Sequence, residues 1–175
     1  MKSAPIRGIG TPIVRAVARV LVELGATPRT LKDVGGYIPG PVADALINSA
    51  ADELDDPAIG LTIARQLGPG SLGPIDYALL TAATWGEAVR RATQFYAVVS
   101  DRMGISLEHH GDEVHVVQRR SSIDMNNRHW IEATFAVLTE RGRQLIGPEF
   151  RLESVAFVHT APTTLVRYKE LFAAP

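Results

Sequence analysis

The sequence predicts an α+β fold, in which a helical N-terminal portion packs beside a small, mainly antiparallel sheet that a long helix covers. Apolar residues recur at helical spacing through about the first hundred residues. Near residue 105 the spacing changes to the alternation of strands, and a long helical pattern follows. The 175 residues fit one domain, with a helical subdomain at about 11–101 and an α/β subdomain at about 102–175.

The first helix is predicted over residues 11–25. Thr11 can cap its start, Pro12 suits the first helical position, and Gly25 suits its end. One face is apolar and is expected to be buried, through Ile13, Val14, Val17, Val20, Leu21 and Leu24.

Three further helices are expected between residues 41 and 83. One follows Pro41, one runs from about Asp56 to Gly68, and a short buried one covers 74–83. The residues expected to point inward from the first two are Val42, Leu46, Ile47, Leu54, Ile59, Ile63 and Leu67. Gly68–Gly73 has the letters of the nucleotide-binding motif G-x-G-x-x-G, but a helix precedes it where that motif needs a strand, so a turn is predicted.

A capping box marks the start of the fifth helix. Thr84 and Glu87 have the spacing at which each side chain satisfies a backbone N–H at a helix start. The apolar face that follows is formed by Trp85, Ala88, Val89, Ala92, Phe95, Tyr96 and Val99.

A β-hairpin is predicted next. Residues 105–108 alternate between apolar and polar, Gly111 and Asp112 can turn the chain, and residues 114–116 alternate again.

Three more elements are predicted after residue 125. A long helix runs from about Asn126 to Leu145, and residues 152–159 read as a third strand. Pro162 then opens a final helix whose apolar residues are Leu165, Tyr168, Leu171 and Phe172.

Composition excludes several classes of protein. The 18 basic and 19 acidic residues leave a net charge of -1, which argues against nucleic-acid binding by this segment alone. The absence of cysteine excludes disulfides and thiolate chemistry and fits a reducing cytoplasm, which is the expected location. No secretion signal or membrane-spanning run is present in the sequence.

The sequence offers little catalytic or metal-binding chemistry. His109 and His115 lie on opposite arms of the hairpin and could approach each other, but no H-E-x-x-H or similar spacing accompanies them. The best acid/base group is Asp101 and Arg102 beside His115 or His129, and it is weak. We therefore expect no enzyme, no cofactor and no metal site.

Aromatic residues offer candidates for a ligand pocket, although aromatic residues at helical spacing are usually plain core. Backbone N–H groups at the start of the long helix, beside His129, favour an anion. Arg102 would suit a carboxylate. The candidate ligand-binding residues are Tyr77, Trp85, Tyr96, Arg102, His129 and Trp130.

Three stretches, read in order, carry a family resemblance. They are LGPIDYALL (Leu72–Leu80) with TWGEAVRR (Thr84–Arg91), the hairpin after Ser100-Asp101, and VAFVHTAP (Val155–Pro162) continuing to Tyr168 and Leu171-Phe172. Together they resemble the arabinose-binding-type N-terminal domain of AraC/XylS-family transcription regulators, over about residues 11–172.

The resemblance implies an effector-sensing domain that often dimerises and that controls a C-terminal pair of DNA-binding helix-turn-helix units. The sequence stops at Pro175, so this DNA-binding domain is expected to be absent, and DNA would be a partner only through it. The expected effector is a small molecule such as an organic acid, an amino acid or a fatty acid, and the expected assembly is a homodimer. An alternative hypothesis is a dimerisation or protein-interaction module without an effector.

Overall fold

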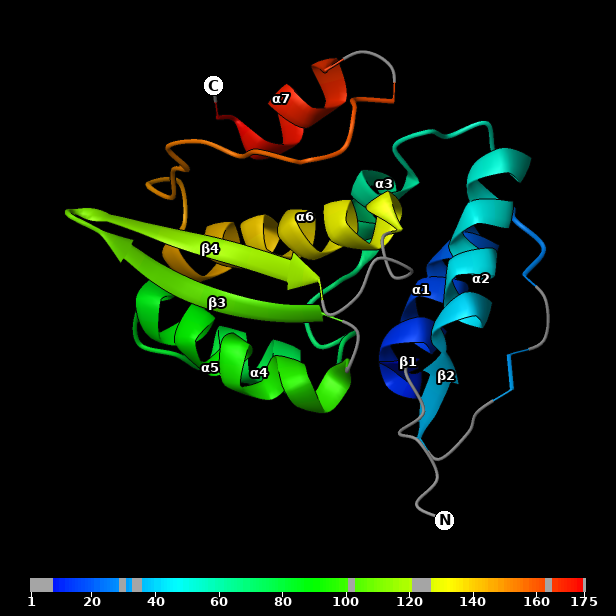
Figure 1. Cartoon of the computed structure of the whole chain (residues 1–175), viewed down its shortest axis with the longest axis horizontal. Helices are drawn as coiled ribbons and strands as arrows, with labels where there is room; N and C mark the ends of the chain where they lie inside the picture. The colour runs from blue at the N-terminus through cyan, green and yellow to red at the C-terminus, as the bar shows by residue number, and fades with distance from the viewer. Residues whose placement is uncertain are drawn as a thin grey trace.

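The computed structural model describes residues 8–28, 31–32, 36–100, 103–120, 127–162 and 165–174. In this part of the chain, helices combine with two small antiparallel sheets, which confirms the predicted α+β class (Figure 1). In chain order the elements are β1 (Gly8–Gly10), α1 (Thr11–Glu23), β2 (Tyr37–Pro39), α2 (Gly40–Glu53), α3 (Ile59–Gln66), α4 (Pro74–Leu80), α5 (Trp85–Val99), β3 (Met103–His110), β4 (Glu113–Arg120), α6 (Arg128–Ile146) and α7 (Val166–Phe172).

The start of the chain contains a sheet that the sequence did not predict. β1 pairs antiparallel with β2, and Ile9 faces Ile38 in the register. β1 runs directly into α1, so Gly10 occupies the N-cap position that we expected Thr11 to fill. Thr11 instead is buried inside the helix, and its N–H donates to the Gly36 carbonyl at 3.0 Å.

Helices α2, α3 and α4 lie where the sequence placed them. The turn prediction for residues 68–73 is confirmed, because α3 ends before it and α4 begins after it. Val42 is a correction: it is 40% exposed, because the buried stripe of α2 is centred on Ala43, Ile47 and Ala50.

Helix α5 has the predicted cap with one difference in detail. Thr84 Oγ1 accepts a hydrogen bond from the Glu87 N–H at 3.2 Å. The Glu87 carboxyl accepts in return from the Ala83 N–H at 3.0 Å, one residue before the position that a standard capping box uses. Phe95 departs from the predicted apolar face, since 45% of it is exposed.

The predicted hairpin is confirmed. β3 and β4 pair along their whole length, and Glu108 lies opposite His115. Ile105 is buried on the inner face, where Leu107 and Val116 are half-buried. The nearest helix to this hairpin is α5.

Helix α6 lies at the centre of the molecule and packs most closely on α3. Asn127 caps it by accepting a hydrogen bond from the His129 N–H at 3.0 Å. The two helices approach closely at Gly60, where a Cβ atom would collide with the His129 carbonyl. After Ile146 the chain reverses at Gly147, whose φ of 85° favours glycine.

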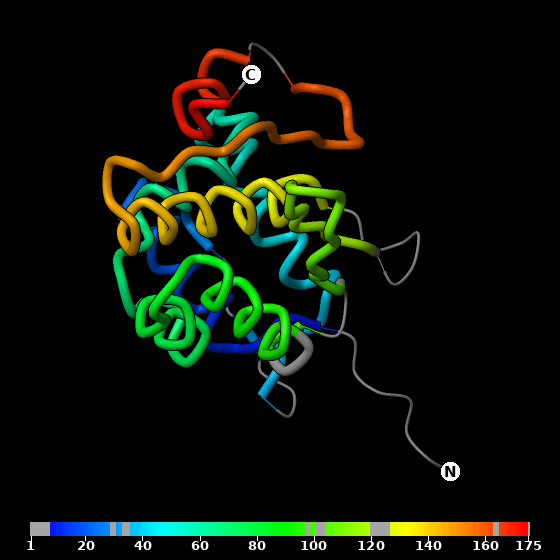
Figure 2. The backbone as a smooth tube through the Cα atoms, turned by 90° about the vertical axis from the view of Figure 1, so that its left-hand side faces the viewer, coloured from blue at the N-terminus to red at the C-terminus, as the bar shows by residue number. Residues whose placement is uncertain are grey.

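Residues 152–159 do not form the predicted third strand. They run as an extended segment over α6, on the side away from α5, and they pair with no strand in the described ranges (Figure 2). Their alternation still has a cause, because Leu152, Val155 and Phe157 pack on the core while Val158 is 90% exposed. The last helix, α7, begins after Leu165, which is half exposed.

None of the helices in the described ranges is long and apolar enough to cross a bilayer.

Candidate functional site

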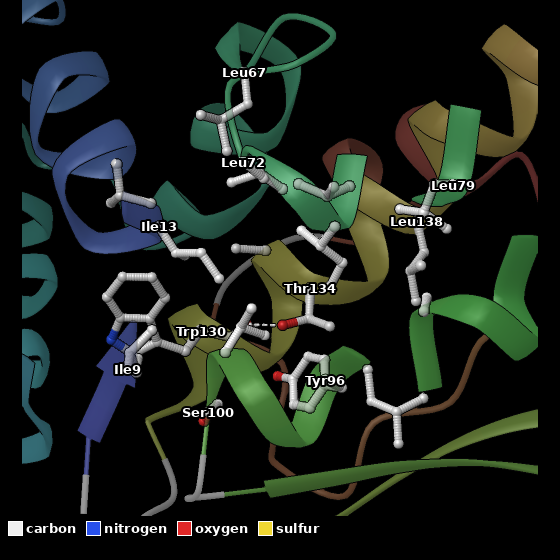
Figure 3. A pocket seen from close by; sticks show the side chains of 17 residues that line it. Ile9, Ile13, Leu67, Leu72, Leu79, Tyr96, Ser100, Trp130, Thr134 and Leu138 are labelled. Carbon is white, nitrogen blue, oxygen red and sulfur yellow. Dashed lines mark hydrogen bonds between the residues drawn. The ribbon is translucent and has the colours of Figure 1, made fainter. Parts of the chain in front are cut away.

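A cavity of about 80 Å³ lies between α1, α5, β3 and α6 (Figure 3). The loop between α3 and α4 contributes Leu67 and Leu72, and α4 contributes Ile75 and Leu79. The cavity therefore sits where the N-terminal helices, the hairpin and α6 meet, and elements from both halves of the chain form its wall.

The cavity wall is almost wholly apolar. Its polar side chains are Tyr96, Ser100, Trp130 and Thr134. The Thr134 hydroxyl donates to the Trp130 carbonyl at 2.8 Å, and the Tyr96 hydroxyl accepts from the amide of Gln118 at 3.1 Å. The indole N–H of Trp130 is buried and has no hydrogen-bond partner among the described residues.

Two of the predicted ligand-binding residues meet in this cavity. Tyr96 reaches it from α5 and Trp130 from the first turn of α6. Arg102, the residue proposed for a carboxylate, lies outside the described residues, as does its neighbour Asp101.

The other three candidates lie elsewhere. Tyr77 points away from the core, with 75% of it exposed. Trp85 packs edge-on against Phe150, with ring centroids 5.2 Å apart, and is absent from the cavity wall. His129 is buried next to Trp130, but it is absent from the cavity wall and faces Glu132 instead.

Most of the wall was not predicted, because isoleucine, leucine, valine and alanine give no sign that they face a void rather than a packed core. The sequence could have indicated Thr134 as a wall residue, because it places a hydroxyl within the apolar stripe of α6. The remaining wall residues are Ile9, Ile13, Val17, Leu67, Leu72, Ile75, Leu79, Ala92, Val99, Ser100, Ile105, Ala133, Val137 and Leu138.

A second polar group lies on the other side of α6, around the fully buried Glu132. One of its oxygens, Oε1, accepts from the Tyr168 hydroxyl at 2.7 Å and contacts His159 Nε2 at 2.9 Å. Arg128 reaches the same oxygen at 3.4 Å. Glu132 Oε2 and His129 Nδ1 lie 4.0 Å apart, and neither has a hydrogen-bond partner in the described part of the chain.

Burial shifts the titration of two groups in this cluster. Burial, assisted by the charge of Arg128, lowers the pKa of His129 to about 4, so this imidazole is neutral at physiological pH. Burial and the hydrogen bond to Glu132 raise the pKa of Tyr168, so its phenol remains a donor.

A buried ion pair joins two of the helices that contribute to the cavity wall, α4 and α6. Arg141 Nε donates to Asp76 Oδ1 at 2.7 Å, and both side chains are at most 1% exposed. The same guanidinium donates to the carbonyls of Leu67 (3.1 Å) and Gly68 (2.9 Å). Arg141 therefore fixes α6 to α4 and to the loop that carries Leu67 and Leu72.

The hairpin histidines are arranged differently from the expectation. His115 lies opposite Glu108, and its ring stacks on His110 rather than His109, with centroids 4.5 Å apart. Within the described ranges, no group of three or more His, Cys, Asp or Glu side chains is placed to hold a metal ion.

Comparison with protein families gives a match over nearly the whole chain. The family described as the arabinose-binding domain of AraC transcription regulators, N-terminal, matches residues 15–175. No curated protein matches the chain. The family match confirms the resemblance inferred from the three sequence stretches, and its range includes the cavity wall from Val17 onwards and the cluster around Glu132.

Proposed function

The chain belongs to the family of arabinose-binding N-terminal domains of AraC transcription regulators, and from this premise we propose that it senses a small-molecule effector. The effector occupies the cavity, where Tyr96 and Trp130 contact it. One observation carries the proposal: the cavity is lined by the helix that also holds the C-terminal segment, defined here as residues 150–162 with α7.

The two sides of α6 give this proposal a mechanism. Trp130, Ala133, Thr134, Val137 and Leu138 form what we call the cavity face. Arg128, Glu132, Phe135 and Arg143 form the C-terminal face, which contacts His159, Phe157 and α7. An effector that binds one position of α6 better than another shifts the population of that position, and the C-terminal segment moves with the helix.

Thermal-shift measurements against a metabolite library test the proposal. An effector that binds only the folded state raises the melting temperature, by an amount that grows with the logarithm of its concentration relative to Kd. The matched control is Ala92→Leu, which fills the cavity from α5. We expect stabilisation of the wild type to be lost in this variant. Failure of every library compound to raise the wild-type melting temperature would overturn the proposal.

A second candidate, a dimerisation module without an effector, is favoured by the small size of the cavity. About 80 Å³ is well below the roughly 300 Å³ at which small-molecule pockets usually begin. In the described part of the chain, β3 and β4 pair only with each other, which leaves strand edges that a second copy can extend. Analytical ultracentrifugation of the apo chain distinguishes the two: a tight dimer that no metabolite stabilises favours the second candidate.

We also propose that DNA contact belongs to another part of the regulator. The net charge of -1 supports this, because phosphate neutralisation dominates nucleic-acid affinity. Specific DNA binding by these 175 residues in a gel shift at physiological salt would contradict it.

A further inference from the structure

We propose that β1 is a gate over the cavity, which opens when Ile9 separates from Ser100 and lets a small-molecule effector enter. This inference rests on the proposed function, because a gate has a role only if the cavity takes a ligand. It concerns the route into the cavity rather than the chemistry of the ligand.

The volume of the cavity requires a movable wall. An apolar cavity of about 150 Å³ holds a benzene molecule, whereas this one measures about 80 Å³. A metabolite of ordinary size therefore enters only if one of the elements in the wall moves aside.

Most of the wall is held firmly in place. Arg141 fixes α6 to α4 and to the loop between α3 and α4. Helices α1, α5 and α6 have 13, 15 and 19 residues, so moving any of them would disturb many packed side chains at once. The strand β1, in contrast, is three residues long and contributes a single side chain, that of Ile9, to the wall.

The contact between β1 and the end of α5 is small. An isolated antiparallel bridge joins Ile9 to Ser100, the residue after α5, and both residues line the cavity. Gly10 makes this contact close, because a Cβ atom there would lie 3.2 Å from the Val99 carbonyl oxygen. Along β2 the strand is paired at all three of its residues. Opening therefore needs only the bridge to break, while the pairing with β2 keeps the strand attached.

An unpaired donor beside β1 favours opening. The indole N–H of Trp130 is buried and lacks a hydrogen-bond partner in the part of the chain that the structure describes. Figure 3 shows its nitrogen turned toward Ile9. An unpaired buried donor destabilises the arrangement that buries it. When β1 moves away, water reaches this N–H, so the open state remains accessible from the closed one.

A disulfide between the two bridged positions tests the gate. The chain has no cysteine, so Ile9→Cys combined with Ser100→Cys creates one defined pair. Residues opposite each other in antiparallel strands have Cα atoms about 4.5–5.5 Å apart, within the roughly 4.4–6.8 Å that a disulfide spans. The reduced form of the same variant is the matched control, because it differs from the oxidised form only in this bond.

The readout is exchange of the Trp130 indole proton with water, followed by two-dimensional ¹H–¹⁵N NMR of the full chain. The amide of Val137, which is buried on α6, reports global unfolding. In the wild type and the reduced variant, the Trp130 indole should be protected at least about tenfold less than the Val137 amide, because local opening suffices. Oxidation should raise its protection to that of Val137. The Trp85 indole, outside the cavity wall, should not respond.

Gly10→Ala tests the gate in the opposite direction. The added Cβ atom pushes β1 away from the Val99 carbonyl. The Trp130 indole should therefore exchange faster relative to the Val137 amide than it does in the wild type. An unchanged ratio would contradict the gate.

The outcomes separate this inference from the proposed function. Equal protection of the Trp130 indole and the Val137 amide in the wild type would overturn the gate, as would Trp130 exchange that oxidation leaves unchanged. A library compound that stabilises the reduced and oxidised variants equally would also overturn it, and effector sensing would stand. If no library compound stabilises the wild type, effector sensing fails, whatever the exchange measurements show.

Discussion

The two faces of α6 bury polar groups in opposite ways. On the side of the cavity face, Arg141 lies four residues beyond Val137; its charge is paired with Asp76, and its N–H groups also reach two backbone carbonyls. On the C-terminal face, Glu132 makes its hydrogen bonds through Oε1, while Oε2 lies 4.0 Å from His129 Nδ1 and has no hydrogen-bond partner among the described residues. On one side of α6, the groups of the buried ion pair all have hydrogen-bond partners, so this pair is saturated. On the other side, the carboxyl of Glu132 uses only one of its two oxygens for hydrogen bonds.

This difference predicts that the Arg141 side of α6 is rigid and that the Glu132 side can rearrange. A saturated buried pair has a single favourable arrangement, so it fixes the loop beside the cavity. A buried carboxyl with an unused oxygen can exchange partners at lower cost, and its partners His159 and Tyr168 belong to the C-terminal segment. We therefore expect the Arg141 side to be static and the Glu132 side to respond when α6 moves.

The largest test removes the saturated pair. Arg141→Ala leaves Asp76 as an uncompensated buried charge and should lower the free energy of unfolding by about 3–5 kcal/mol. Urea denaturation measures it. The control is Arg91→Ala, whose pair with Glu87 on α5 is about a third exposed, so a loss of about 0–1 kcal/mol is expected. Similar losses in the two variants would contradict the contrast between buried and surface pairs.

The elements that the sequence predicted correctly are those that depend on neighbouring residues. The cap of α5 and the turn at Gly111 are decided within a few residues, so local patterns revealed them. The β1–β2 pairing joins residues on either side of α1, and the pair Asp76–Arg141 spans 65 positions, so no local pattern could show either.

The candidate site shows the same limit. Tyr96 and Trp130 were found because an aromatic ring with a polar atom is useful to a ligand, and the structure places both at the cavity. Glu132 was missed because a glutamate on a helix normally faces solvent, whereas here Tyr168 and His159 dock on it and α3 approaches it at Gly60. The false strand at 152–159 has a related cause, since alternation fits any extended segment with one side packed on helices.

Acid should weaken the C-terminal side of α6 through His129. Its pKa is about 4 in the folded state against 6.5 as the reference value, so between these values the unfolded state binds a proton that the folded state refuses. The free energy of unfolding should therefore fall as pH drops from 6.5 toward 4, by up to about 1.4 kcal/mol per pH unit from this residue.

Urea titrations between pH 7 and pH 4 measure this slope. His129→Gln should flatten it, because the variant has no buried imidazole to protonate. His109→Gln removes an exposed imidazole from β3 and serves as the control. Equal flattening in both variants would show that the slope does not come from His129.

A milder change separates the two faces without disturbing the core. Tyr168→Phe removes the hydroxyl that donates to Glu132 Oε1 and should cost about 1–2 kcal/mol. Amide hydrogen exchange should increase in α7, while the amides of the α6 cavity face keep their protection. Loss of protection on both faces to the same degree would show that the two faces are not separable.

The smallest test alters the start of α6, which the two faces share. Asn127→Ala removes the side-chain acceptor for the His129 N–H and should lower the free energy of unfolding by about 1 kcal/mol. Asn127→Asp keeps that acceptor but loses the amide that donates to Asn48, so it separates the cap from the link to α2. Because the cap positions Trp130 and Glu132 together, Asn127→Ala should weaken binding of any cavity ligand and speed exchange in α7 by similar factors. If only ligand binding or only the exchange in α7 changed, the coupling between the two faces would arise within α6 rather than at its start.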